Sequence, residues 1–162
     1  MKHKKISFEL EVYDSADQLT KEDAALLEAA KKVTANAYAP YSSFKVGAVA
    51  QLANGETISG TNQENASYPI GICAERVLLS AASSVYPGVP VETMAISYHN
   101  DHGTSKNPVS PCGICRQTIV EYQNRTKQPI RLILAGEEGK VYVIPRADML
   151  LPLQFSGEDL KA

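Results

Sequence analysis

The sequence predicts an α/β fold built on a mixed sheet of about five strands, with helices packed on its faces. Stretches with apolar residues at helical spacing alternate with short apolar runs typical of strands, and this alternation is the pattern of a sheet covered by helices. The turns at Asn54-Gly55 and Glu138-Gly139 predict hairpins, which join antiparallel strands. Passages from a strand through a helix to the next strand require parallel pairs. The sheet is therefore expected to be mixed.

Length and composition favour one globular domain. The 162 residues are enough to bury a core, and 44% hydrophobic with 21% charged residues argues against disorder. No apolar run approaches the roughly 20 residues of a membrane-spanning helix. The basic start, residues 1–5, is followed by Glu9 and Glu11, which interrupt what would be the apolar part of a secretory signal. We therefore expect a cytoplasmic protein with no membrane partner.

The charge balance argues against a nucleic-acid polymer as partner. Lysine plus arginine number 16 and aspartate plus glutamate 18, so the net charge is −2. Proteins that bind nucleic acids usually carry a basic surplus on at least one face. The only dense basic run is residues 2–5, and a solvated terminus explains it equally well.

An extended segment and one long helix are predicted first along the chain. Apolar residues alternate over residues 6–13, the period of a short strand or an extended surface arm. Thr20 can cap a helix, and apolar residues at helical spacing follow it. This helix should end near Tyr38, because Pro40 restricts the residue before it to extended geometry.

A hairpin and a long loop come next. We expect a strand over 44–52 and, after the Asn54-Gly55 turn, a return strand to about residue 60. Residues 61–72 are expected to be irregular, because they contain a proline and a glycine that break regular structure.

The second half alternates helices and strands. The expected elements are a helix over about 73–85, a buried strand over 91–98, a polar loop over 99–108, a helix from Pro111 through Tyr122, strands over 130–135 and 140–144, and a short helix over about 146–150.

All three cysteines lie in two short motifs, Ile72-Cys73-Ala74-Glu75-Arg76 and Pro111-Cys112-Gly113-Ile114-Cys115-Arg116. An odd number of cysteines argues against a complete disulfide framework. Cys112 and Cys115 are three apart at a predicted helix start, so both sulfurs can reach one ion.

Cys73 also lies at a predicted helix start, so two facing helix starts could offer three sulfurs to one zinc ion. The free amides and the positive end of a helix favour the thiolate that zinc needs. Three protein ligands leave a fourth position open for water, as a catalytic zinc site requires. The histidines are candidates for a fourth ligand, but none of them lies in a motif: His3, His99 and His102.

Glu75 is the candidate for proton transfer beside the sulfurs. A carboxylate in the first turn of the helix could take a proton from water and hand it to a leaving amine; the alternative is that it only favours the helix N-terminus. Arg76 and Arg116 could offset the negative charge of three thiolates by bonding to sulfur. The alternative for both arginines is a surface ion pair.

The two motifs resemble the zinc deaminase signature, in which a metal ligand-x-Glu is followed by Pro-Cys-x-x-Cys. Cys73 occupies the position that is histidine in many members. The chain from about Tyr38 to the tail at 155–160 is similar to the small, homotetrameric cytidine deaminases. Two further stretches carry this resemblance, Phe44-Lys45-Val46-Gly47-Ala48 and Asn62-Gln63-Glu64-Asn65-Ala66-Ser67-Tyr68-Pro69.

The resemblance implies a three-layer α/β/α sandwich with one zinc ion per subunit. It implies hydrolysis of the nucleosides cytidine and deoxycytidine to uridine and deoxyuridine in pyrimidine salvage. It also implies a homotetramer whose pockets are completed by neighbouring subunits. On this basis residues 1–19 form an N-terminal extension and residues 20–162 a single catalytic domain.

The resemblance also assigns roles to residues. Zinc is bound by Cys73, Cys112 and Cys115, while Glu75 moves protons and holds the pyrimidine ring. The implied substrate-binding positions are Phe44 on the base, Asn62 and Glu64 on the ribose hydroxyls, Ala74, and the aromatics Tyr68 and Phe155. Without the resemblance, Asn62 and Glu64 could equally stabilise a loop, and Phe44 could be a core aromatic.

Three alternatives remain from the sequence. A deaminase of another aminated nucleoside, such as a nucleoside antibiotic, would use the same fold. A structural zinc or redox module could use Cys112 and Cys115, but it leaves Glu75 unexplained. A polynucleotide-editing role is disfavoured by the net charge. The long polar loop over 98–109 leads into the second motif and could alter access to the pocket.

Overall fold

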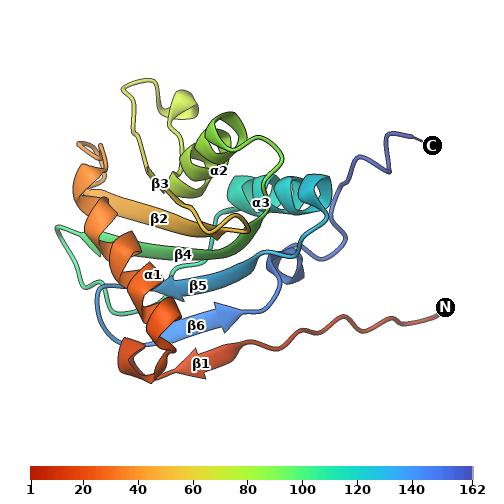
Figure 1. Ribbon diagram of the computed structural model, residues 1–162, viewed down its shortest axis with the longest axis horizontal. Helices are drawn as coiled ribbons and strands as arrows, with labels where there is room; N and C mark the ends of the chain where they lie inside the picture. Colours follow the sequence, from red (N-terminus) through yellow and green to blue (C-terminus); the bar gives the residue numbers. More distant parts are fainter. Residues whose placement is uncertain (162) are drawn as a thin grey trace.

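A six-stranded mixed sheet forms the middle layer of the protein, in the order β1-β6-β5-β4-β2-β3 (Figure 1). The computed structural model describes residues 1–161. The strands are β1 (Glu11–Tyr13), β2 (Phe44–Leu52), β3 (Thr57–Thr61), β4 (Val91–Asn100), β5 (Arg131–Ala135) and β6 (Val141–Ile144). The pair β4–β5 is parallel and the other neighbouring pairs are antiparallel. The predicted α/β fold with a mixed sheet is confirmed.

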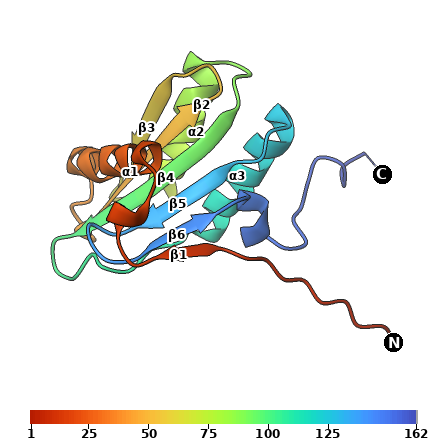
Figure 2. The same cartoon turned by 60° about the horizontal axis from the view of Figure 1, so that its bottom comes forward.

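Helices cover both faces of this sheet, as Figure 2 shows. The helices are α1 (Lys21–Val33), α2 (Ala74–Val85) and α3 (Gly113–Thr126), with short 3-10 segments η1 (Ala16–Gln18), η2 (Thr34–Asn36), η3 (Tyr68–Ile70) and η4 (Ala147–Leu150). On one face α1 packs through Leu27 and Ala30 against Val49 and Ile133. On the other face α2 and α3 enclose the larger apolar cluster. The result is a three-layer α/β/α sandwich.

The sheet has one strand more than expected, because the end of the N-terminal segment joins it. Val12 lies opposite Tyr142, so β1 extends the sheet beyond β6. The expected strand over 6–13 is shorter in the structure, since only its last three residues pair. The predicted short helix over 146–150 is the 3-10 segment η4.

The predicted parallel pairing holds for one of the two strand-helix-strand passages. The passage through α3 joins the parallel neighbours β4 and β5. The passage through α2 carries the chain past β2, so β3 and β4 run in the same direction but do not pair. Instead β2 pairs antiparallel with both of them. The expectation of a parallel pair around α2 was therefore wrong, because a crossover helix can span an intervening strand.

Local signals set the start of α1 and the turn of the first hairpin, whereas α1 ends at Val33 and not near Tyr38 as expected. The hydroxyl Oγ1 of Thr20 accepts a hydrogen bond from the backbone N–H of Asp23 at 3.2 Å, which caps the helix as predicted. At the hairpin, Gly55 adopts a φ of 85°, a conformation that favours glycine. The side chain of Asn54 accepts a hydrogen bond from the N–H of Glu56 at 3.1 Å.

The two ends of the chain extend from the body on the same side (Figures 1 and 2). Residues 1–10 are exposed and precede β1. Among residues 1–161, no helix has the length and apolar character needed to cross a lipid bilayer.

Candidate active site

Three sulfurs converge where α2 and α3 begin. Cys73 is the N-cap residue of α2, Cys112 is the N-cap residue of α3, and Cys115 lies in the first turn of α3. The sulfur of Cys112 is 3.8 Å from that of Cys73 and 3.5 Å from that of Cys115, and all three lie within 4.8 Å of one another. Thiolates bound at about 2.3 Å to one tetrahedral zinc ion lie about 3.8 Å apart. The donor set and its spacing therefore fit zinc.

The electrostatics of the cluster favour a cation. The pKa of the Cys73 thiol is lowered to about 6, mainly because Cys115 donates a hydrogen bond to its sulfur. Donating this bond, together with burial, raises the pKa of Cys115. A lowered pKa makes the Cys73 thiolate more available, and a divalent ion binds the thiolate in place of its proton.

The side chain of Glu75 is buried beside these sulfurs. Glu75 is only 5% exposed and lines the same cavity as Cys73 and Cys112. Burial raises the pKa of this carboxyl above its ordinary value. A carboxyl group with a raised pKa holds a proton more readily near neutral pH, which suits it to transfer protons.

A cavity of about 350 Å³ opens in front of Glu75 and the sulfurs, within the size range of small-molecule sites. Six of the residues singled out from the sequence line it: Phe44, Asn62, Glu64, Cys73, Glu75 and Cys112. They come from β2, from the loop after β3 and from the starts of α2 and α3. The structure thus brings together residues that are up to 68 positions apart in the sequence (112 − 44).

Tyr98 also lines the cavity, although it was not predicted from the sequence as a site residue. Its ring stacks on Phe44 with 4.8 Å between ring centroids and 14° between planes. Tyr98 belongs to β4, where it lies opposite Val46 of β2. Since the antiparallel pairing of β2 with β4 was not predicted, nothing in the sequence placed these two rings together. Ser42 and Val109 also line this cavity and were not singled out.

Asn62 uses its side chain to hold the start of β2. Its Oδ1 accepts a hydrogen bond from the N–H of Val46 at 2.7 Å, and its Nδ2 donates to the carbonyl of Phe44 at 2.9 Å. These bonds are the loop-stabilising role that the sequence had left open for Asn62. They leave one N–H and one lone pair of the amide free.

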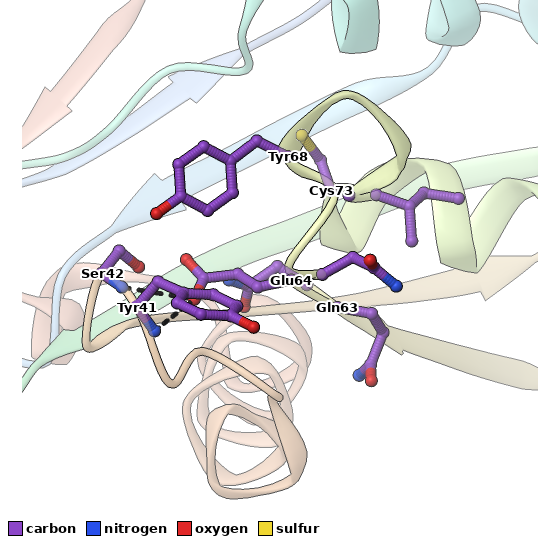
Figure 3. A pocket seen from close by; sticks show the side chains of 10 residues that line it. Tyr41, Ser42, Gln63, Glu64, Tyr68 and Cys73 are labelled. Atoms are coloured by element: carbon purple, nitrogen blue, oxygen red, sulfur yellow. Dashed lines mark hydrogen bonds between the residues drawn. The ribbon is translucent and has the colours of Figure 1, made fainter.

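Glu64 fixes the turn before β2 in a similar way. Its Oε2 accepts from the backbone N–H of Tyr41 at 2.8 Å and of Ser42 at 3.2 Å, as the dashed lines in Figure 3 show. Hydrogen bonds, first that from the side chain of Ser42, lower the pKa of the Glu64 carboxyl. The carboxylate is therefore ionised at neutral pH, and Oε1 stays available to another donor.

A second cavity, of about 480 Å³, continues from the first toward Tyr41 and Tyr68 (Figure 3). The two cavities share four residues in their walls: Ser42, Asn62, Glu64 and Cys73. Tyr68 meets Tyr41 edge-on, with ring centroids 5.6 Å apart at 67°, and it is 73% exposed. Tyr68 is thus positioned at the outer, open end of the cavity system.

Two other predicted substrate contacts lie apart from the cavities. Ala74 is fully buried at the first position of α2, where a backbone N–H has no partner within the helix. Phe155 is 58% exposed and lines neither cavity. Its carbonyl accepts a hydrogen bond from the side chain of Gln117 at 2.9 Å.

The two arginines beside the cysteines, Arg76 and Arg116, make different contacts. The guanidinium of Arg116 donates to the carbonyls of Pro111 at 2.8 Å and Leu150 at 3.0 Å. Its hydrogen bonds therefore go to the backbone beside Cys112 and not to a sulfur. Arg76 is half-buried, and its charge contributes to the lowered pKa of Cys73.

His99 is held by carboxylates and is not part of the sulfur cluster. Its Nδ1 lies 2.6 Å from Oε1 of Glu137, and its Nε2 lies 2.9 Å from Oδ1 of Asp101. These contacts attach the start of the polar loop to the turn after β5. The end of the same loop brings Val109 and Ser110 to the cavity wall.

Comparison with known proteins identifies the family. Residues 20–128 match the sequence model of the cytidine and deoxycytidylate deaminase zinc-binding region. A cytidine deaminase of Halalkalibacterium halodurans is 36% identical over 135 residues, which are 83% of this chain and 95% of that protein. The chain belongs to the cytidine and deoxycytidylate deaminase family.

Other members agree in sequence and in fold. A cytidine deaminase of Sporosarcina psychrophila is 37% identical over 136 residues, 83% of this chain and 92% of that protein. The crystal structure of cytidine deaminase from Burkholderia pseudomallei has 39% sequence identity and a TM-score of 0.70, covering 85% of this chain and all of that one. As a member of this zinc-binding family, the protein is an enzyme of the deaminase type with zinc as its cofactor, and its sulfur cluster could hold such an ion.

Proposed function

We propose that this protein hydrolyses cytidine and deoxycytidine to uridine and deoxyuridine with release of ammonia. The observation that carries this proposal is one cavity that joins a buried carboxyl, Glu75, to two of the three clustered sulfurs and to the aromatic ring of Phe44. The similar proteins named cytidine deaminase support the choice of cytidine.

Cys73, Cys112 and Cys115 are proposed to hold one zinc ion per subunit. When bound there, zinc supplies Lewis acidity that lowers the pKa of a water molecule. The chain would supply three thiolates to this ion, and two of them, Cys73 and Cys112, line the cavity. The charge of Arg76 and the N-terminal ends of α2 and α3 offset part of the negative charge of the sulfurs.

Glu75 is proposed to carry the proton through the reaction. Its carboxylate takes a proton from the attacking water and delivers it to N3 of the pyrimidine, while the water oxygen bonds to C4. The carboxyl group then moves the remaining hydroxyl proton to the amine at C4. The bond between C4 and the amine nitrogen breaks, ammonia leaves, and the C4 carbonyl of uridine forms. A raised pKa suits Glu75 to hold and release this proton.

The remaining cavity residues are proposed to orient the nucleoside. Phe44, backed by Tyr98, offers a flat surface for the pyrimidine ring. The free N–H of the Asn62 amide and the Oε1 atom of Glu64 can bond the ribose hydroxyls. The N–H of Ala74, free of helix bonds, is proposed as a further donor to the base.

We also propose a homotetramer in which neighbouring subunits complete each pocket. The exposure of Tyr68 and Phe155 supports this assembly, because both rings are free to contact another subunit. We further propose a cytoplasmic location and a role in pyrimidine salvage, which are compatible with the proposed substrates. Sedimentation velocity of the purified protein would test the assembly.

Ultraviolet absorbance of cytidine incubated with the purified protein tests the reaction. The protein is assayed as isolated, after zinc removal and after zinc readdition, with deoxycytidine in parallel. We expect conversion to uridine that is lost and regained with the metal. No conversion despite about one bound zinc per chain would reject these substrates, and aminated nucleoside antibiotics would be assayed next. A protein with no bound zinc and a reversible disulfide would overturn the proposal.

A further inference from the structure

The N-terminal arm, defined as residues 1–13, exposes a row of large apolar side chains. In an extended chain alternate residues point to one side, so these side chains share a face. Their exposed fractions are 51% for Ile6, 40% for Phe8, 38% for Leu10 and 55% for Val12. The arm leaves the body in line with β1 (Figures 1 and 2). It also precedes residue 20, where the match to the family model begins.

The arm leads into an edge of the sheet that is open to pairing. β1 is the outermost strand, with β6 on one side and, within residues 1–161, no strand on the other. An edge strand presents free backbone N–H and C=O groups, and an exposed apolar edge is a template for another strand. A second strand here would extend the ladder and cover part of the apolar row.

The charges of the arm complement each other when two arms run antiparallel. Basic residues lie in its first half and acidic residues in its second half: Lys2, Lys4 and Lys5, then Glu9 and Glu11. Reversing one arm against another copy therefore places basic beside acidic side chains. Opposite charges across neighbouring strands are stabilising and like charges are destabilising.

We propose that the arms of two copies of this chain pair antiparallel about a twofold axis at Phe8. This register places Lys5 opposite Glu11 of the partner copy on one face. On the other face it places Ile6 opposite Leu10 and Phe8 opposite Phe8 of the partner copy, with Val12 opposite Lys4 at each end. Because both arms contribute equally, the contact has the closed symmetry of a homodimer interface.

Neighbouring registers are less favourable. A shift of two residues toward the body places Glu9 opposite its own copy, which sets two carboxylates side by side. A shift the other way leaves both Leu10 and Val12 opposite lysines, whereas the proposed register leaves only Val12 opposite a lysine. A shift of one residue would bring the apolar residues of one arm to the same face as the charged residues of the other arm.

A second copy fits this arm better than an anionic membrane surface does. Glu9 and Glu11 alternate with the apolar residues along the arm and would be repelled by anionic lipid. The alternation has the period of a strand, whereas helices that bind in the membrane interface have apolar residues at helical spacing. The pairing is independent of the reaction proposed above.

Cysteine substitution on the zinc-loaded, full-length protein tests the register. Phe8→Cys should form a disulfide-linked dimer under mild oxidation, because residue 8 faces its own copy. Ile6→Cys is the matched control: residues 6 of the two copies would lie roughly 13 Å apart along the strand, so it should not crosslink with itself. Ile6→Cys mixed with Leu10→Cys should crosslink. Unsubstituted protein, treated in the same way, accounts for the native cysteines.

Charge reversal gives a second readout that a mobile tail would not reproduce. Lys5→Glu in the Phe8→Cys background should lower the yield of disulfide about fivefold, and Glu11→Lys should do the same. The protein with both reversals should regain the original yield, because the pair is restored with its signs exchanged. Equal crosslinking at positions 6, 8 and 10, or no rescue by the double reversal, would overturn the proposal.

Discussion

Burial of the Glu75 carboxyl is the strongest single-residue indication of chemistry in this protein. A glutamate that only favours a helix start normally keeps its carboxylate in water, whereas Glu75 is 5% exposed and has a raised pKa. Placing a carboxyl there costs desolvation. The cost is offset if the group acts on a ligand in the cavity that it lines.

Replacing Glu75 by glutamine should stop turnover without removing zinc. Glutamine keeps the size of the side chain but cannot accept and return a proton, so we expect kcat to fall about 10²–10⁴-fold. Initial rates on cytidine, together with zinc analysis of the same sample, check this. Glu56→Gln on the exposed β2–β3 turn is the matched control. Normal turnover in zinc-loaded Glu75→Gln protein would remove Glu75 from the reaction.

Tyr98 should act on substrate binding through Phe44. Removing the ring in Tyr98→Ala leaves Phe44 without its stacking partner, and such a pair is worth about 0.5–1.5 kcal/mol. We expect KM for cytidine to rise about 3–10-fold with a smaller change in kcat. Tyr98→Phe keeps the stack and should behave like the unsubstituted enzyme. A Tyr98→Ala enzyme with unchanged KM would show that the stack does not position the base.

At the scale of elements, the start of α2 is placed by a close approach to β3. A Cβ atom added at Gly60 would lie 2.5 Å from the carbonyl oxygen of Ala74 and 2.5 Å from the nitrogen of Leu78. Both contacts are with backbone, so the helix itself would have to shift. This contact holds the helix that carries Cys73 and Glu75 at its N-terminus.

Gly60→Ala should therefore destabilise the fold and disturb the site together. We expect the free energy of unfolding to fall by about 1–3 kcal/mol, with lower activity in the folded protein. Urea denaturation at saturating zinc measures the first effect. Gly113→Ala is the control, since nothing lies within 4 Å of the added Cβ there. Equal stability of the two variants would mean that α2 adjusts without cost.

The ion pair between α1 and β5 should give the protein a pH-dependent stability. Arg131 donates to both carboxylate oxygens of Asp23, at 2.6 and 2.7 Å, and lowers the pKa of Asp23. The unfolded chain therefore binds a proton to Asp23 at higher pH than the folded chain does. The stabilisation is fully present above the unfolded pKa of about 3.9 and is lost as pH falls through the folded pKa.

Asp23→Asn should lower the free energy of unfolding at pH 7 by about 1–3 kcal/mol. The difference between the two proteins should shrink below about pH 4. Denaturant unfolding of both proteins across this pH range checks the prediction, and the comparison cancels acid effects on the zinc site. Glu28→Gln is the control on the same helix, because Glu28 is 53% exposed in its pair with Lys31. A pH-independent difference would contradict the pKa assignment.

At the scale of the whole molecule, the proposed zinc site joins the starts of two helices that come from separate parts of the chain. Cys73 begins α2 and Cys112 begins α3, and both helices pack over the larger apolar cluster. A metal that binds only the folded chain adds its binding free energy to folding stability. The catalytic metal should therefore also have a structural effect.

Removal of zinc by a chelator should lower the melting temperature by about 10 °C, which corresponds to about 4 kcal/mol at a metal concentration a thousand times Kd. Differential scanning calorimetry with metal analysis measures this. Cys115→Ala should melt at a temperature that no longer depends on chelator. An unchanged melting temperature in protein shown to be free of zinc would contradict a link between the metal and the fold.

Local features of this chain could be predicted because they depend on near neighbours. The cap of α1 by Thr20, the turn at Gly55 and the helix starts at both cysteine motifs follow from backbone propensities over a few residues. The three cysteines also limit the metal chemistry, since three thiolates and a nearby carboxyl suit few functions other than a zinc site. The sequence by itself therefore determined the fold class and indicated which cysteines and which carboxyl would lie together.

Tertiary structure alone decided which strands and side chains meet. The pairing of β2 with β4 stacks Tyr98 on Phe44, and the pairing of β1 with β6 adds the sixth strand. It also decided that Asn62 bonds the backbone of β2. The spacing of apolar residues indicates which side of a helix or strand is buried. It does not indicate which other element that side packs against. The choice of partner depends on packing between distant segments, which no local pattern in the sequence encodes.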